Sequence, residues 1–385
     1  MAIVVLLTAI ATTASAAATA PSAAQWEKWL HLPGVFDLAG PRADGLLVAA
    51  AHSRLSLLST SGFVTDFAPE YSAPDGSESY IAMSPGLTVV SAGCSFARDD
   101  VFALDLKGTP PGVARITAAG SVSRLATVAG ASTLSGITFD TLGDFGHRLL
   151  VIGPSGSGHT AVEAIDCRGS VTPVGTVATS LEGGIAVAPR GFGRFAGQLI
   201  AANEVAGSVY AVSSVGQLQQ VAASGVPAGG DIGVESVGFV PATGAVAAYV
   251  ADRATPGNPH PGTDSVLRLG GAALAAGGVQ PGELLVATEG GDTLVGVRYN
   301  GSCVATVLAT GPPTAHGEGR LLIVAAPTTA SAGVTTPGPD TQPAATAAGS
   351  TGHTATAVTL SAVAVVLVSG ATVAVALARR RRPRT

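Results

Sequence analysis

A recurring unit fills most of the chain between residues 25 and 325. Each unit has a Gly, a short apolar run, a turn, a second apolar alternation, and another Gly before a third run. The unit that begins at Gly197 continues through 208–212 to 216–218. The clearest copies begin at Gly45, His147, Gly197 and Gly282, and weaker copies begin near Gly86 and Gly244. Short runs between turn residues, without a sustained helical period, predict an all-β region.

The spacing of these units predicts how the strands are arranged. About six units follow one another at intervals of about 40 to 60 residues, which is the spacing of four-stranded propeller blades. A further run suited to an innermost strand precedes each of the first five units, at 35–38, 80–83, 137–140, 185–188 and 237–240. The sixth unit has none before it, but 320–324 follows it, so we expect this C-terminal strand to close the ring. A β-propeller with six blades is preferred, five or seven remain open, and a pair of β-sandwiches is the alternative.

The C-terminal end predicts a membrane anchor. Residues 355–378 are apolar and contain no charged side chain, and Arg379–Arg382 and Arg384 follow at once. A helix that rises about 1.5 Å per residue crosses a hydrocarbon core of about 30 Å in about 20 residues. Positive residues beside a span stay on the cytoplasmic side. The sequence therefore predicts one transmembrane helix at 355–378, a cytoplasmic tail at 379–385, and an extracellular location for everything before the helix.

The N-terminus and the segment before the span agree with export. Residues 1–20 combine an apolar start with small-x-small cleavage sites at 14–16 and 18–20, as in a secretory signal peptide, although no Lys or Arg precedes the apolar core. An uncleaved anchor is the alternative, but about ten apolar residues are short for a span. Residues 326–354 consist mainly of Pro, Thr, Ala, Ser and Gly, which predicts a disordered stalk. We expect a single-pass protein of the cell membrane with its N-terminus outside.

The amino-acid composition indicates the kind of genome that encodes the chain and the classes of partner that it can bind. Two lysines stand against eighteen arginines, and Ala, Gly and Val dominate, a usage typical of a high-GC genome such as that of an actinobacterium. The net charge of -5 gives no reason to expect nucleic acid as a partner. Cys94, Cys167 and Cys303 lie outside the expected membrane span. Export predicts one disulfide and one free thiol, with the pairing left open.

One blade opening carries a resemblance to known proteins. Residues 181–189, Leu-Glu-Gly-Gly-Ile-Ala-Val-Ala-Pro, look like the start of a blade in the broad group of six-bladed propellers that includes NHL-repeat, gluconolactonase-like and strictosidine-synthase-like proteins. The resemblance covers only residues 25–325 and depends on the blade pattern. It implies that acidic and amide side chains at the mouths of inner strands hold a divalent cation in enzymatic members.

Four glutamates stand where such ligands are expected. They precede or begin inner-strand runs and are Glu78, Glu182, Glu235 and Glu318. Carboxylate oxygens at a common centre suit Ca²⁺, which takes six to eight oxygen ligands. The chain departs from the group because Asn is scarce, and Asn203 and Asn258 do not stand at equivalent positions. The alternative is that these glutamates are solvated groups that cap strand ends.

A stiff loop at 252–264 is a second candidate site. It interrupts the fifth unit and contains three prolines, which lower the entropy lost on binding. Its charged and hydrogen-bonding side chains are Asp252, Arg253, His260 and Asp264. The loop either binds a ligand or covers a blade edge.

These patterns predict a function at the cell surface. Binding of an extracellular protein, glycan or small molecule is favoured over catalysis, because no acid, base and nucleophile set can be assembled from the sequence. A calcium-dependent lactonase or esterase is the enzyme alternative, with the ion as Lewis acid. A structural surface protein is the second alternative.

Overall fold

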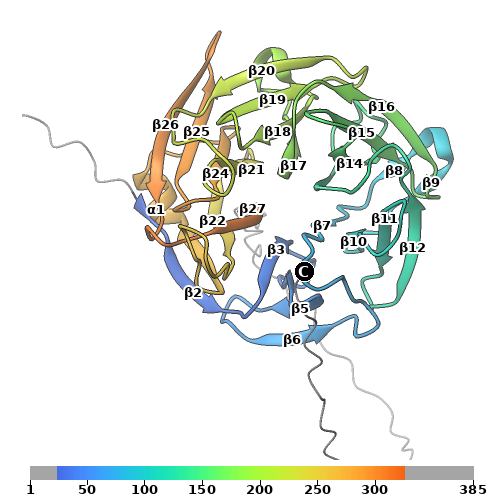
Figure 1. Ribbon diagram of the computed structural model, residues 1–385, viewed down its shortest axis with the longest axis horizontal. Coiled ribbons are helices and arrows are strands. Elements are labelled where there is room, and N and C mark those ends of the chain that lie inside the picture. The colour runs from blue at the N-terminus through green and yellow to red at the C-terminus, as the bar shows by residue number, and fades with distance from the viewer. Residues whose placement is uncertain (1–23, 326–385) are drawn as a thin grey trace, which may run out of the picture. The chain divides into compact units, whose positions relative to one another are not determined.

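Residues 24–325 form a six-bladed β-propeller in the computed structural model, and these are the residues that the structure describes (Figure 1). Six sheets form a ring, and the innermost strands, which border the central axis that is called the channel below, contact one another in the order β3, β7, β13, β17, β21 and β27. The predicted all-β fold and the preferred blade count are confirmed.

The first four blades are each built from consecutive strands that pair antiparallel. Blade 1 contains β3 (Val35–Ala39), β4 (Leu47–Ala51), β5 (Arg54–Leu58) and β6 (Val64–Phe67). Blade 2 contains β7 (Ile81–Met83), β10 (Val101–Asp105), β11 (Gly112–Ile116) and β12 (Val122–Thr127). Blade 3 contains β13 (Gly136–Phe139), β14 (Leu149–Pro154), β15 (Thr160–Ile165) and β16 (Val171–Val177). Blade 4 contains β17 (Glu182–Val187), β18 (Leu199–Asn203), β19 (Ser208–Val212) and β20 (Leu218–Ala223).

The last two blades are interleaved along the chain. Blade 5 contains β21 (Val234–Phe239), β24 (Leu284–Thr288), β25 (Leu294–Tyr299) and β26 (Cys303–Thr310), with β1 (Ala24–Gln25) added in parallel. Blade 6 contains β27 (Gly317–Ala325), β22 (Ala245–Asp252), β23 (Ser265–Gly270) and β2 (Glu27–His31). The short elements outside the blades are β8 (Thr88–Val89), β9 (Cys94–Ser95), the 3-10 helices Val90–Ala92 and Gly193–Phe195, and α1 (Gly271–Ala276).

The interleaving confirms one sequence prediction and corrects another. The C-terminal strand β27 is the innermost strand of blade 6, and β2 from the N-terminus is its outermost strand, so both ends of the described chain close the same blade. The run at 237–240, however, does not belong with the unit that begins near Gly244. It pairs with the Gly282 unit, with Phe239 opposite Leu284. Both pairings bury the same kind of apolar strand, so local alternation does not distinguish them.

Two glycines allow the inner strands to approach closely around the channel. Gly183 and Gly319 have φ values of 77° and 70°. A Cβ on Gly183 would lie 1.8 Å from the backbone oxygen of Glu235, and one on Gly319 would lie 2.2 Å from that of Phe36. Neither place has room for a side chain, so the blade-opening pattern at 181–189 has glycine for a packing reason.

The inner strands are joined through one buried carboxylate. Asp37 is fully buried and accepts hydrogen bonds from the backbone N–H groups of Leu38 at 2.7 Å, Ile81 at 2.6 Å and Arg320 at 2.6 Å. These residues lie in β3, β7 and β27, so Asp37 connects blade 1 with both of its neighbours. The unpaired inner edges of β7 and β27 thereby gain acceptors that no neighbouring strand supplies.

A disulfide links blades 2 and 3 outside the channel. It joins Cys94 of β9 to Cys167, just after β15, while Cys303 is a free, half-buried thiol. The predicted arithmetic of one disulfide and one free thiol is confirmed.

Within residues 24–325, no helix is long and apolar enough to cross a membrane. The predicted signal peptide (1–20), stalk (326–354), transmembrane helix (355–378) and cytoplasmic tail (379–385) lie outside the described residues. They remain predictions.

Candidate functional site

Six glutamates gather at one end of the channel, where the inner strands begin. The four predicted ones lie close to the starts of β7, β17, β21 and β27, and two more follow the second strands β18 and β24. We call this set the acidic mouth: Glu78, Glu182, Glu204, Glu235, Glu289 and Glu318. Their charges act on one another, since Glu289 and Glu318 raise the pKa values of both Glu78 and Glu182. The structure therefore brings the four predicted residues together.

Sequence reasoning missed Glu204 and Glu289 because it searched only the residues before inner strands. Both stand seven residues after the Gly that opens their unit, Gly197 and Gly282. Superposing the repeats would have placed these two carboxylates at equivalent positions, each just after a second strand. That signal was present in the sequence.

Burial sets the protonation of the acidic mouth. It is the main cause that raises the pKa of Glu235 well above its usual range, and the charge of Glu318 adds to it. Burial, followed by a hydrogen bond with Glu289, raises the pKa of Glu204 to about 9. Burial and Glu318 raise the pKa of Glu78 to about 7. Without a cation, several of these carboxyl groups hold protons near neutral pH.

Tyr80 and Glu235 form a buried pair at the base of the acidic mouth. The Tyr80 hydroxyl donates to Glu235 Oε1 at 2.5 Å, and both side chains are almost fully buried. Phe36 packs edge-on against Tyr80, with ring centroids 4.9 Å apart. The pair fixes the orientation of the Glu235 carboxyl group.

His316 stands between two of the glutamates. Its Nε2 lies 3.0 Å from Glu289 Oε1 and 3.3 Å from Glu318 Oε1. Burial lowers the pKa of His316, but the hydrogen bonds to Glu289 and Glu318 raise it to about 10. One ligand atom from each of these three residues lies within 4.8 Å of the others, a spacing that suits a metal ion. The histidine has to lose its proton before Nε2 can bind such an ion.

The donor set fits a divalent cation. Five buried or half-buried carboxyl groups supply the oxygen ligands that Ca²⁺ prefers. The imidazole nitrogen of His316 suits Zn²⁺ better than Ca²⁺. The residues that would hold an ion are thus Glu289 and Glu318, with His316 as the nitrogen donor and Glu204, Glu182 and Glu235 around them.

Arg253 forms the border between the acidic mouth and a neighbouring pocket. Its Nη1 lies 3.1 Å from Glu318 Oε1 and 3.4 Å from Glu78 Oε1, and its guanidinium carbon lies 5.4 Å from the centre of the Phe36 ring. Among the described residues, Arg253 and His316 are the cationic groups that contact the acidic mouth, and between them they pair with three of its six carboxyl groups, Glu78, Glu289 and Glu318. Negative charge is therefore in excess when the glutamates are ionised.

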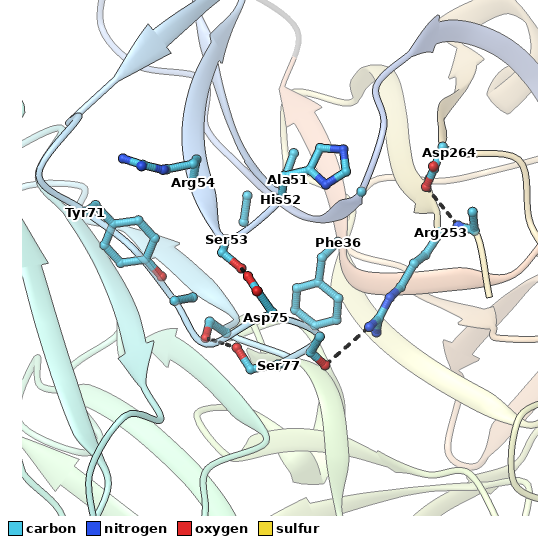
Figure 2. Close-up of a pocket in the computed structure, with 16 residues that line it drawn as sticks. Phe36, Ala51, His52, Ser53, Arg54, Tyr71, Asp75, Ser77, Arg253 and Asp264 are labelled. Atoms are coloured by element: carbon cyan, nitrogen blue, oxygen red, sulfur yellow. Dashed lines mark hydrogen bonds between the residues drawn. The ribbon is translucent and has the colours of Figure 1, made fainter. Parts of the chain in front are cut away.

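The pocket beside Arg253 has a volume of about 350 Å³. Figure 2 shows its wall, which comes from β3, the hairpin between β4 and β5, the connection from β6 to β7, and the 252–264 loop. The polar side chains that line it are His52, Ser53, Arg54, Tyr71, Asp75, Ser77, Ser79, Arg253 and Asp264. The ring of Phe36 supplies an apolar surface.

The structure separates the four predicted loop residues. Arg253 and Asp264 line the pocket (Figure 2). Asp252 is fully buried and accepts hydrogen bonds from the His316 backbone N–H at 2.9 Å and from the Thr263 hydroxyl. The His260 ring contacts the Pro313 carbonyl oxygen, 2.8 Å from Nδ1. The loop thus presents two of these side chains to the pocket and uses two in its own contacts.

The fold and this site define the class of the molecule: a six-bladed β-propeller with a glutamate-lined channel mouth. No family model matches the sequence, and no curated protein matches it. Solved propeller structures do match, at low identity.

The structural matches include three different kinds of protein. Virginiamycin B lyase from Staphylococcus aureus is 11% identical with a TM-score of 0.38, and the match covers 71% of this chain and 84% of that one. A gluconolactonase from Xanthomonas campestris is 15% identical with a TM-score of 0.39, covering 60% and 69%. A chain of a nidogen/laminin complex is 12% identical with a TM-score of 0.44, covering 74% and 83%. At this level the likeness concerns the fold alone.

Proposed function

We propose that this protein is a membrane-anchored propeller of the cell surface that binds an extracellular ligand at the acidic mouth with the help of a divalent cation. The observation that carries the proposal is the excess of carboxyl groups over cations there. Four of the six glutamates are buried, and Arg253 and His316 are the only cationic side chains among the described residues that pair with the set. Buried carboxylates without a counter-charge are costly, so they take up either protons or a cation.

A bound cation would supply Lewis acidity and a positive charge at the centre of the mouth. The chain's own residues would position a ligand around it. Tyr80 holds Glu235, and Arg253 holds Glu318 and Glu78, so the carboxyl groups that face the ion are oriented by neighbours. Arg253 also extends from this centre to the pocket wall, so a ligand in the pocket would lie next to the ion.

Cation-dependent hydrolysis of a lactone or ester is the second candidate function. One contact favours it: if the carboxylates alone bind the ion, His316 keeps the proton on Nε2, which lies 3.3 Å from the Glu318 carboxylate that would bind the ion. Hydrolysis that requires the cation and is lost in Glu318→Gln would support this reading. Ligand binding without turnover supports the binding role. A chain that binds neither cation nor ligand would have only a structural role.

Calcium is expected to raise the melting temperature of the full-length protein. A ligand at 100 times its Kd adds about 2.7 kcal/mol to the free energy of unfolding, which corresponds to about 4 °C for a domain of about 300 residues, because the entropy of unfolding is about 2.1 cal/mol/K per residue. Glu318→Gln should remove most of the shift, because this residue lies at the centre of the cluster, and Glu182→Gln should weaken it. The measurement is differential scanning fluorimetry with Ca²⁺, Mn²⁺ or EDTA.

Glu27→Gln is the matched control for this experiment. Glu27 is 58% exposed and pairs with Arg268 on the outer part of blade 6, so its variant should retain the full shift. Melting curves that are the same in EDTA and in each cation would contradict the cation site.

Anchoring and orientation have their own test. The apolar run at 355–378 and the arginines after it support a C-terminal span with the tail inside. Protease added to intact cells should digest the propeller and spare a tag placed after Thr385. Digestion of that tag from outside would show that the proposed orientation is wrong, and release of the intact protein into the medium would argue against the anchor.

A further inference from the structure

Another pocket lies at the far end of the inner strands, away from the acidic mouth. It has a volume of about 300 Å³ and is formed where β3, β7 and β13 end and the connections after them begin. Two arginines, Arg98 and Arg320, line it, and we call it the arginine pocket. None of the residues that line it belongs to the acidic mouth.

Arg320 reaches this pocket from the inner strand of blade 6. Its Nη2 donates to the Ile137 carbonyl oxygen, and its Nη1 donates to Thr138 Oγ1 at 3.5 Å. Both acceptors belong to β13 of blade 3, which stands opposite blade 6 in the ring. The Arg320 side chain therefore crosses the channel, and its charge lies between the acidic mouth and the pocket.

The Arg320 guanidinium has a positive charge that no neighbouring carboxylate pairs with. It forms no salt bridge with any of residues 24–325, and its Nε makes no hydrogen bond with them. Burial lowers the pKa of Arg320, and the charge of Asp37 offsets only part of this effect. A cation that is partly removed from water without a paired anion costs free energy. An anion in the pocket would reduce that cost.

Arg98 gives the pocket a second positive charge. It lies in the connection between β9 and β10, its side chain is exposed, and it forms no salt bridge within the described chain. Asp99 is the carboxylate among the lining residues, and its Oδ2 accepts a hydrogen bond from the Ala43 N–H at 3.1 Å. Two arginines against one aspartate leave one surplus positive charge, which favours a ligand with one negative charge.

The size and the remaining wall of the pocket limit the ligand further. Pro41, Met83 and Pro85 line it, and each is at least partly exposed. These side chains suit a short hydrocarbon group. A volume of about 300 Å³ lies at the lower end of the range for small-molecule sites. Inorganic phosphate fits this wall less well, because it has no apolar part.

We infer that the arginine pocket binds a small organic monocarboxylate, whose charged group pairs with Arg98 and Arg320 and whose hydrocarbon part contacts the apolar wall. Guanidinium groups bind carboxylates through charge-assisted hydrogen bonds, which are stronger than neutral ones. The inference goes beyond the proposed function, since the arginine pocket and the acidic mouth share no residue.

Butyrate and its uncharged amide, butyramide, are the probes for this site. Each is titrated into the full-length protein in an uncharged detergent, and the Kd is measured by ligand-observed NMR. Butyrate should bind at least about tenfold more tightly than butyramide, because only butyrate forms charge-assisted hydrogen bonds. Inorganic phosphate, titrated in the same way, should bind more weakly than butyrate.

Three variants test the charges that the inference uses. Arg320→Gln should weaken butyrate binding about tenfold or more, since it removes a partly buried charged donor. Arg98→Gln should weaken it about threefold to fivefold, because an exposed ion pair contributes less. Asp99→Asn should tighten binding by a similar factor, since it removes the opposing negative charge. Asparagine also tolerates the left-handed φ of 65° at this position.

Arg190→Gln is the matched control for the loss of an arginine. The Arg190 side chain is 61% exposed, pairs with Asp144 and is not among the residues that line the pocket. This variant should bind butyrate as the unchanged protein does. Arg98 is exposed, so Arg98→Gln tests the site even if Arg320→Gln does not fold.

The inference is wrong if butyrate does not bind, or if butyramide or phosphate binds as tightly as butyrate. It is also wrong if Arg98→Gln and Asp99→Asn both leave the Kd for butyrate unchanged. A calcium titration of the same samples separates this inference from the proposed function. A calcium shift without butyrate binding would remove the arginine pocket and leave the cation site in place, whereas butyrate binding without a calcium shift would support the arginine pocket alone.

Discussion

Asp37→Ala is expected to lower the free energy of unfolding by about 3–9 kcal/mol, since it leaves three backbone N–H groups without an acceptor at about 1–3 kcal/mol each. The carboxylate is fully buried and bonds to Leu38, Ile81 and Arg320. Two of these donors lie in the inner strands of blades 2 and 6, so the change removes contacts on both sides of blade 1. Equilibrium denaturation in urea checks the result.

Two comparisons give this prediction its control. Asp37→Asn keeps one acceptor oxygen and should lose less stability than Asp37→Ala. Asp66→Ala changes an exposed residue of the outermost strand of the same blade, and its midpoint should move little. If Asp37→Ala and Asp66→Ala unfold at the same urea concentration, the carboxylate does not hold the inner strands together.

The inner strands could be located from the sequence because their signal is local. Runs predicted at 35–38 and 137–140 correspond to β3 (Val35–Ala39) and β13 (Gly136–Phe139). Small and β-branched residues crowd the channel, and turn residues mark both ends of each run. The run predicted at 185–188 began too late, because Gly183 and Gly184 hid the start of β17 at Glu182.

The partners of the last inner strands could not be read from the sequence. After β21, the chain leaves blade 5 and forms β22 and β23 of blade 6. It then returns to blade 5 as β24. Pairing across such distances depends on which sheet the strand meets in three dimensions. Apolar alternation predicts which face of a strand is buried, but it does not predict which strand pairs with it.

The candidate site was predictable in part for the same reason. Glu78, Glu182, Glu235 and Glu318 lie beside inner strands, so their convergence followed from the predicted ring. The position of His316 between Glu289 and Glu318 depends on the interleaving of blades 5 and 6.

Without divalent cations, the protein is expected to be more stable near pH 5 than near pH 8. Burial raises the pKa of Asp37 from 3.8 to about 6, and burial raises that of Glu204 from 4.5 to about 9. In each case the folded state keeps a proton that the unfolded chain releases at lower pH. Stability therefore falls as the pH rises through these ranges. For Asp37 alone, the part of the pKa shift that lies between pH 5 and pH 6 is about one unit, which corresponds to about 1.4 kcal/mol between pH 5 and pH 8.

His316 and Glu289 also affect how the stability of the protein depends on pH. Burial lowers the pKa of His316, but its hydrogen bonds to glutamates raise it to about 10. The contribution of His316 to the free energy of unfolding is complete below about pH 6.5 and is lost as the pH rises through about 10. Burial acts to raise the pKa of Glu289, yet the His316 hydrogen bond prevails and lowers it. Its contribution is present above about pH 4.5 and is lost in more acidic solution, which places the optimum near pH 5.

Calcium should flatten this profile, because the ion binds the ionised carboxylates and competes with protons for the acidic mouth. The gain in stability from calcium should therefore be larger at pH 8 than at pH 5. Urea denaturation at pH 5, 6, 7 and 8, in EDTA and in calcium, measures both effects. Glu204→Gln removes one titrating group and should reduce the slope in EDTA, whereas Glu27→Gln should leave it unchanged. A free energy of unfolding that rises from pH 5 to pH 8 in EDTA would show that the folded protein holds its glutamates ionised without a cation. The argument for a cation site would then fail.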